Sequence, residues 1–206
     1  MTLRKYYMVT ILLVGLCVLN VARAEVHRSE LPASTSFSDG PKVCLGCHQE
    51  EAITAVQRSS HGQARDSRTP FAQQGCESCH GAAGEHAGDP TAYQPAVVFG
   101  ANAAASDQNQ VCLGCHEGQN RDQWNWHVSD HARADVTCTS CHDPHSPNQK
   151  VLARDTQWTV CVTCHTDKRL GITQFSRHPI REGQVVCADC HNPHGGIGPS
   201  MLVRAT

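Results

Sequence analysis

The sequence predicts a mostly irregular chain with short α-helices and little or no β-sheet. Aromatic residues make up 5% of the 206 residues, so side chains alone would bury too little apolar surface to offset the entropy lost on folding. The chain also contains 13 cysteines, and twelve of them stand in close pairs. The weak apolar composition and the paired cysteines together predict a core that a bound group helps to form.

Every one of these pairs belongs to a Cys-x-x-Cys-His pentapeptide. The six are Cys44-Cys47-His48, Cys76-Cys79-His80, Cys112-Cys115-His116, Cys138-Cys141-His142, Cys161-Cys164-His165 and Cys187-Cys190-His191. Chance would give about 0.05 such matches for this composition, and the pentapeptide is the attachment signal of c-type haem. Zinc ribbons need no histidine after each cysteine pair. We therefore predict six covalent haem c groups, held by the twelve cysteines, with the six motif histidines as proximal iron ligands.

An internal repeat divides the chain into two-haem units at about residues 43–110, 111–159 and 160–196. Each unit has a first motif preceded by Val, a Ser-x-His tripeptide, a second motif and a histidine just beyond it. The repeat therefore offers one additional histidine for each iron, and neutral imidazole is a good iron ligand. The predicted distal ligands are His61, His86, His131, His145, His178 and His194.

Two histidines and one methionine lie outside this repeat. We expect His27 to belong to a flexible N-terminal segment over residues 25–42. We expect His127 to bind no iron, with the alternative that it replaces His131 as a ligand. Beyond the leader only Met201 could supply a thioether ligand. Because methionine ligation raises the potential of a haem, its scarcity predicts low potentials.

Residues 1–24 are typical of a secretory signal peptide. Two basic residues precede an apolar run over residues 8–21, and Ala22-Arg23-Ala24 fits a cleavage site. We expect export to the periplasm and a mature chain that begins at Glu25. The alternative is an uncleaved anchor, although the run is shorter than the about 20 residues of a membrane span. Cleavage leaves a formal charge of about −5, and no basic patch suggests nucleic acid.

The motifs also resemble a known family over residues 43–196. The residues that carry the resemblance are Val111-Cys112-Leu113-Gly114-Cys115-His116, Trp126 with Ser129 and His131, the stretch from Val136 to His145, and Ser176-Arg177-His178-Pro179 with Glu182-Gly183 and the stretch from Cys187 to Gly195. They are similar to the decahaem periplasmic electron conduits of metal-reducing bacteria, which insert into an outer-membrane porin and have relatives in extracellular sulfoxide reduction. The resemblance implies bis-histidine haems in a staggered chain and no catalytic site. This sequence has six motifs rather than ten.

We therefore expect an electron carrier in anaerobic respiration or extracellular electron transfer. Its expected partners are redox proteins, namely a quinol-oxidising donor cytochrome and an acceptor cytochrome or reductase, with an outer-membrane porin as a further candidate. Two alternatives stay open. A multihaem reductase of a small nitrogen or sulfur oxyanion would need a five-coordinate iron and nearby acid–base groups. A subunit of an extracellular cytochrome filament would need haems exposed at both ends.

Overall fold

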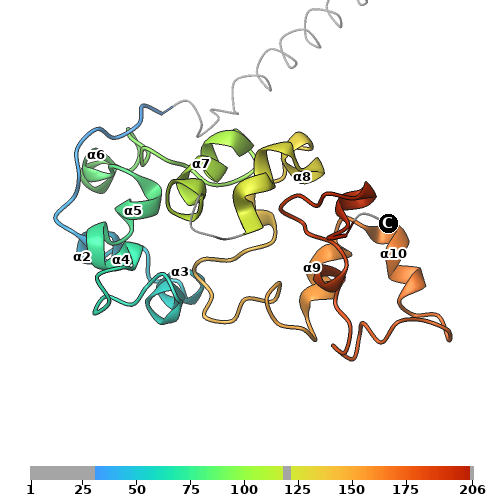
Figure 1. Ribbon diagram of the computed structural model, residues 1–206. Coiled ribbons are helices and arrows are strands. Elements are labelled where there is room, and N and C mark those ends of the chain that lie inside the picture. The colour runs from blue at the N-terminus through green and yellow to red at the C-terminus, as the bar shows by residue number, and fades with distance from the viewer. Residues whose placement is uncertain (1–30, 118–121, 205–206) are drawn as a thin grey trace, which may run out of the picture. The chain divides into compact units, whose positions relative to one another are not determined.

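The computed structural model of the chain describes residues 31–117 and 122–204 (Figure 1). The predicted signal peptide, its cleavage site and His27 lie outside the described residues. Contacts divide the chain into Met1–Pro32 and Ala33–Thr206, and the second unit carries all six haem-attachment motifs. In the described residues no helix is long and apolar enough to cross a membrane.

Short helices joined by turns and irregular segments make up this unit, which confirms the predicted fold class. The helices are α2 (Pro41–Leu45), α3 (Glu51–Thr54), η2 (Ala55–Arg58), α4 (Pro70–Gln74), α5 (Glu77–His80), α6 (Gly84–Gly88), α7 (Ala105–His116), η3 (Asp122–Val128), α8 (Asp130–Arg133), η4 (Cys138–Ser140), α9 (Gln157–Cys161), α10 (Thr166–Gly171), η5 (Cys187–Asp189) and η6 (Pro199–Met201). Extended pairing in the described residues is limited to two isolated bridges, Ala33 with Gln94 and His191 with Leu202.

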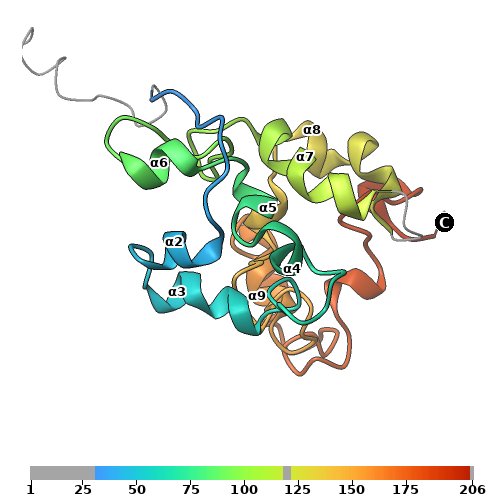
Figure 2. The same cartoon turned by 90° about the vertical axis from the view of Figure 1, so that its left-hand side faces the viewer.

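The helices that carry successive motifs pack against each other. Helix α7, with the third motif, contacts η4, where the fourth motif begins, and α9 contacts η5 in the same way at the fifth and sixth motifs. In the first part of the unit α4 packs against α5, and two views show the chain passing from α4 through α5 to α6 (Figures 1 and 2). The local structure is therefore built around pairs of neighbouring motifs.

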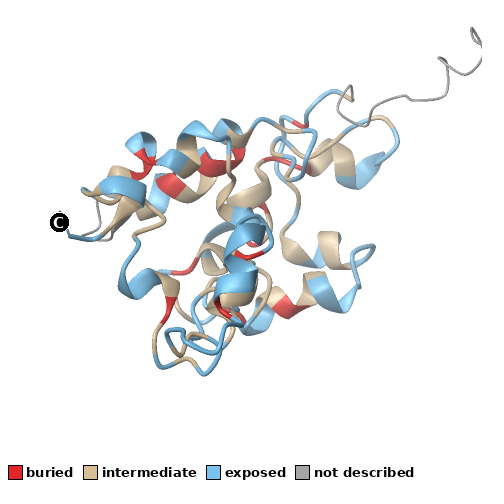
Figure 3. Ribbon diagram, turned by 90° about the vertical axis from the view of Figure 1, so that its right-hand side faces the viewer, coloured by how far each residue is buried: buried red, intermediate tan, exposed pale blue. Residues whose placement is uncertain are grey.

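The apolar core of the described residues is small. Its buried hydrophobic members are Ala55, Ala82, Ala83, Leu113, Trp126, Val162, Ile172 and Val186. Three of them are alanines, and Figure 3 shows the buried positions scattered among intermediate and exposed ribbon rather than gathered in one layer. So little buried apolar area suits a chain whose interior is completed by a bound group.

The N-terminal segment predicted to be flexible over residues 25–42 is held to the unit in its described part. The Ser36 amide donates a hydrogen bond to the Glu85 carboxylate at 3.1 Å, and the Ser38 amide donates one to Glu77 at 2.9 Å. Hydrogen bonds of this kind lower the pKa of Glu85 to about 2. These two carboxylates therefore hold the described part of a segment that was expected to be flexible because it lies near the N-terminus.

Candidate haem-binding sites

Each motif forms a single helical turn. The histidine amide donates to the carbonyl of the first cysteine at 2.9–3.0 Å in five motifs, and the third motif lies within α7; the five bonds are His48 to Cys44, His80 to Cys76, His142 to Cys138, His165 to Cys161 and His191 to Cys187. Residues three and four apart lie on one face of such a turn, so two thiols and one imidazole share a side. All twelve cysteines are free thiols, as thioether attachment to a porphyrin requires.

Ten of the predicted ligand histidines form pairs, each of which joins a motif histidine to a histidine from the repeat. The ring centroids are 6.4 Å apart for His48–His86, 6.3 Å for His80–His145, 6.0 Å for His61–His116, 6.1 Å for His142–His194 and 6.1 Å for His131–His165. The angles between the ring planes range from 17° to 74°. The distance between the two rings is thus nearly the same in all five pairs, whatever the angle between the ring planes.

This distance suits a metal bound between two imidazoles. A metal–imidazole bond is about 2.0 Å, and the bound nitrogen lies about 1.1 Å from the ring centre, so rings on opposite sides of one metal have centroids about 6.3 Å apart. Directly stacked aromatic rings come closer, to as little as about 4.5 Å. The five pairs therefore fit iron with an axial imidazole on each side.

Hydrogen bonds fix which ring nitrogen faces the metal position. Three of the predicted ligands have Nδ1 hydrogen-bonded to a backbone carbonyl; the pairs are His86 with Tyr93 at 2.9 Å, His131 with Pro193 at 2.9 Å and His191 with Ser200 at 2.8 Å. Donation from Nδ1 leaves the lone pair on Nε2 for a metal and raises its basicity. These contacts are the outer partners that iron-binding imidazoles need.

Aromatic side chains pack against two of the paired imidazoles. The Phe99 ring lies edge-on to His80, with centroids 5.2 Å apart, and Trp126 lies 6.2 Å from His194. Trp126 is one of the few large buried side chains. Phe99 and Trp126 therefore orient ligand rings rather than build a separate core.

Two of the three serines of the Ser-x-His tripeptides, Ser59 and Ser129, fix the backbone around the following histidines, a role that the sequence analysis did not assign. Ser59 and Ser129 are only 1% and 2% exposed. Ser129 caps α8 by accepting a hydrogen bond from the Ala132 amide at 3.0 Å, and Ser59 accepts one from the His61 amide at 3.3 Å. The regular Ser-x-His spacing was the available signal for this function.

Burial keeps several paired imidazoles neutral. It lowers the pKa of His61, His80 and His142 below the ordinary value of 6.5, because a buried imidazolium loses its hydration. Nearby histidines add to the effect at His80 and His142. Only the neutral ring can bind iron, so these three positions favour the ligand form even in mildly acidic solution.

The thiols of successive motifs are neighbours. In chain order the neighbouring pairs are Cys44–Cys76, Cys79–Cys112, Cys112–Cys138, Cys141–Cys164 and Cys161–Cys187. A hydrogen bond with Cys138 raises the pKa of Cys112, and the one with Cys161 lowers the pKa of Cys187 to about 6. The six attachment points therefore follow one another in space in the same order as in the sequence.

The remaining histidines have different surroundings. His127 is exposed, and its Nε2 lies 2.9 Å from the Glu117 carboxylate. His178 is also exposed, and within the described residues its ring contacts no other aromatic ring. His191 is exposed and meets the Ser200 carbonyl, but within the same residues no histidine ring lies opposite it. Of the twelve predicted ligands, His178 and His191 are thus the two that form no imidazole pair within the described residues.

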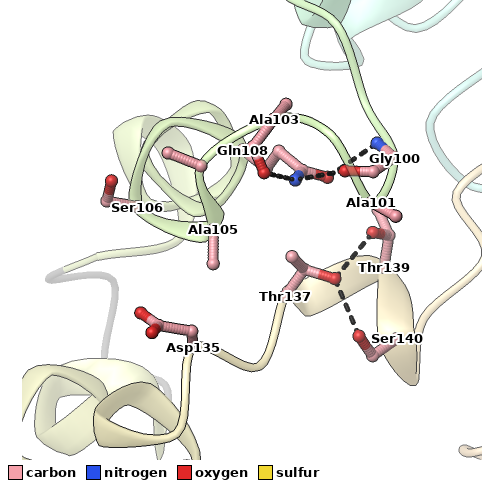
Figure 4. Close-up of a pocket in the computed structure, with 11 residues that line it drawn as sticks. Gly100, Ala101, Ala103, Ala105, Ser106, Gln108, Asp135, Thr137, Thr139 and Ser140 are labelled. Carbon is pink, nitrogen blue, oxygen red and sulfur yellow. Dashed lines mark hydrogen bonds between the residues drawn. The ribbon is translucent and has the colours of Figure 1, made fainter. Parts of the chain in front are cut away.

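One open pocket lies between the start of α7 and the segment around η4 (Figure 4). Gln108 closes one side by hydrogen bonds to Gly100 and Ala103, and Thr137 bonds to Ser140 on the other. Its lining offers hydroxyl groups and the Asp135 carboxylate but no cysteine or histidine. Because these groups neither attach a porphyrin nor bind haem iron, we place no haem in it.

Family models of c-type cytochromes match most of the chain in succession. The model described as "Cytochrome c554 and c-prime" matches residues 20–81, "Cytochrome c-type protein NrfB-like" matches residues 76–159, and "Cytochrome c3" matches residues 130–198. A multiheme cytochrome MtrA of Shewanella baltica (strain OS185) is 38% identical over 124 residues. That stretch covers 59% of this chain and 36% of the relative, so the chain spans about a third of the relative's length.

The local geometry and these matches agree. Helical turns present two thiols and an imidazole on one side, and paired imidazoles leave room for a metal between them. Matches to three cytochrome c models lie over the same motifs, and such families attach haem c through these cysteines. Three cytochrome c models together span residues 20–198, so the chain is similar to multihaem c-type cytochromes along most of its length.

Proposed function

We propose that the chain binds six haem c groups, each with two histidine ligands, and relays electrons between redox proteins in the periplasm. The observation that carries the proposal is the set of five imidazole pairs at 6.0–6.4 Å. In this assignment the twelve motif cysteines attach the porphyrins and the six motif histidines are proximal ligands. The distal ligands are His61, His86, His131, His145, His178 and His194.

The assignment of His131 rather than His127 is supported by their surroundings. The His131 ring lies opposite that of His165, and its Nδ1 faces the Pro193 carbonyl. The Nε2 of His127 is occupied by the Glu117 carboxylate at the surface. His131→Ala should therefore create one high-spin haem, and His127→Ala should leave every haem low-spin.

The arrangement suits transfer of electrons rather than conversion of a substrate. When bound, haem c supplies an iron that gains and loses one electron. Where an imidazole lies on each side of the metal position, no coordination site is left for a substrate. The imidazole pairs that contact Phe99 and Trp126 are held in place, so their rings need move little when the iron gains or loses an electron. The neighbouring thiols of successive motifs support a relay that follows the chain order.

The proposed partners are a quinol-oxidising donor cytochrome and an acceptor cytochrome or reductase, with an outer-membrane porin as a possible anchor. The similarity to a multiheme cytochrome supports this, and exchange with such partners is served by small, weak interfaces. The sequence of the leader supports export. Periplasmic fractionation of cells that express the full chain, with N-terminal sequencing of the mature protein, should find a start at Glu25.

Mass spectrometry and a spectrum test the haem content and ligation. The denatured holoprotein should retain six haems, because thioether bonds survive unfolding, and fewer than five would overturn the assignment. The oxidised protein should be low-spin at the five paired sites, and the haems should reduce over a broad range of negative potentials. High-spin iron at two or more sites would contradict the proposed ligand pairs.

A reductase remains the second candidate because one site differs from the others. His191 has no histidine ring opposite it within the described residues, and part of the chain matches the NrfB-like model. A reductase needs an iron with an open position and acid–base groups around it. Rapid turnover of nitrite, hydroxylamine or sulfite with an artificial donor, together with one stoichiometric high-spin haem, would favour this candidate over the carrier.

A further inference from the structure

The histidine pairs follow a rule across the predicted two-haem units. Two such pairs form at each of the two junctions between units. The histidine of the Ser-x-His tripeptide in the earlier unit lies opposite the histidine of the first motif in the later unit. The closing histidine of the later unit lies opposite the histidine of the second motif in the earlier unit. The four pairs that obey this rule are His61–His116, His80–His145, His131–His165 and His142–His194. Each junction is therefore a reciprocal exchange of two ligands.

This rule leaves two histidines over at each end of the series. At the N-terminal end they are His48 and His86, and they pair with each other at 6.4 Å. The longer Gly-rich segment before His86 allows His86 to reach His48 of its own unit. The Ser34 hydroxyl stabilises this position by accepting a hydrogen bond from the His86 amide at 3.0 Å. The first unit thus has its own cap, as terminal repeats usually do.

The C-terminal end has no comparable closure among the described residues. Its two remaining histidines, His178 and His191, are both exposed. Ser176, which corresponds to the buried Ser59 and Ser129, is exposed as well. The third unit therefore keeps the sequence of a unit that forms a junction, but within the described residues neither histidine meets another imidazole.

Local contacts hold His178 in this exposed position. Its carbonyl accepts the Ile180 amide at 2.7 Å, and Arg177 beside it forms an ion pair with Glu182. Arg154 binds the end of the same loop by donating to the Gly183 carbonyl at 3.0 Å. The loop is thus organised by its own hydrogen bonds while the histidine it carries faces outward.

We propose that a second copy of the chain completes this end, in a two-fold dimer in which His178 of each copy binds the sixth haem iron, above His191, of the other. The proposal rests on the haem ligation proposed above. Within the described residues the third unit carries one exposed histidine, His178, and one motif histidine, His191, that meet no other imidazole. In a dimer with a two-fold axis the same surface of each copy forms the contact. Each His178 can therefore reach the iron above His191 of the other copy.

Exposed apolar side chains beside these groups support an interface there. Phe175, three residues before His178, is 104% exposed, and Leu170 on α10 is 71% exposed. Large side chains exposed in one region favour association, because burying them removes apolar surface from water. The dimer would join two six-haem series through their last haems and double the length of the relay.

The test measures mass and spin state on the same haem-loaded protein over a range of concentrations. The wild-type chain should be a dimer with six low-spin haems per chain, and on dilution one haem in six should become high-spin as monomers form. His178→Ala should be a monomer with one high-spin haem in six at every concentration. His127→Ala, the matched surface control, should behave as the wild type.

A second variant separates ligation from folding. Phe175→Ser keeps His178, so it should shift the monomer–dimer equilibrium toward monomers while the concentrated protein stays fully low-spin. Suppose instead that the wild-type chain is a monomer with six low-spin haems and that His178→Ala makes one of them high-spin. His178 would then bind the sixth iron of its own chain, which would overturn the proposed dimer but not the proposed haem ligation. A wild-type monomer with one high-spin haem at all concentrations would also overturn the proposed dimer. Loss of low-spin signal at the other five sites would instead contradict the proposed function.

Discussion

Gly195, which directly follows His194, offers a sharp test of how the chain positions a distal ligand. Its φ is +118°, and a Cβ added there would lie 2.7 Å from both Cβ and O of Asn125. Gly195→Ala should therefore cost about 1–3 kcal/mol for overpacking and about 1–3 kcal/mol for the unfavourable backbone angle. The preceding residue is His194, whose ring lies 6.1 Å from that of His142, so a shift of this backbone would move a proposed ligand.

If His194 moves away from the metal position to relieve this strain, it binds the iron less tightly. Each 2 kcal/mol shifts the equilibrium between bound and released histidine about 30-fold, because 1.4 kcal/mol is a factor of ten. Electron paramagnetic resonance of the oxidised holoprotein should then show one high-spin haem, which added imidazole converts back to low-spin. Gly171→Ala is the control, since nothing lies within 4 Å of the added Cβ. An unchanged low-spin spectrum and thermal midpoint in Gly195→Ala would refute the reasoning.

Three further predictions concern capping, pH and the core. Ser129→Ala removes the cap of α8 and should cost about 1 kcal/mol of stability, seen as a lower thermal midpoint, whereas Ser176→Ala at the exposed equivalent should change little. In the holoprotein His80 can bind iron only as the neutral ring, and burial lowers its pKa in the same sense, so unfolding takes up a proton below pH 6.5 and stability falls as the pH drops below that value. Urea titrations of the haem-loaded protein that showed greater stability at pH 5 than at pH 7 would contradict this. The haem-free chain, with its small apolar core, should give a disordered circular dichroism spectrum and no cooperative melt.

The fold class could be predicted because it depends on composition and local pattern. Few aromatic residues and many cysteine pairs already excluded a large apolar core, and each motif needs only one helical turn to form. The N-terminal segment could not be predicted in the same way. Its place near the N-terminus predicted flexibility, but the carboxylates that bind Ser36 and Ser38, Glu85 and Glu77, are 39 or more residues away in sequence.

The repeat predicted which histidines are available but not which of them meet. Spacing along the chain places His61 between the first and second motifs, so its contact with His116 of the third motif depends on how the units pack. The choice between His131 and His127 stayed open for the same reason, because four residues of sequence separate them and either ring could face an iron. In the structure His131 lies opposite His165 and meets the Pro193 carbonyl, a partner 62 residues away, and these contacts are the support for our proposal that His131 is the ligand.

Reciprocal ligand exchange has a consequence for how such a chain folds. If every junction shares two iron ligands between neighbouring units, no single two-haem unit contains all four histidines that its own irons require. Attachment of haem to one motif is then useful only when the adjoining unit has folded against it, and metal binding is coupled to the folding of the whole series. The buried serines at Ser59 and Ser129 lie at these junctions, where the backbone before each exchanged histidine must be fixed. A truncation after residue 159 should therefore remove His194 from its place opposite His142 and leave the fourth haem of the shortened chain high-spin; a fully low-spin fourth haem in that fragment would show that the units do not depend on one another.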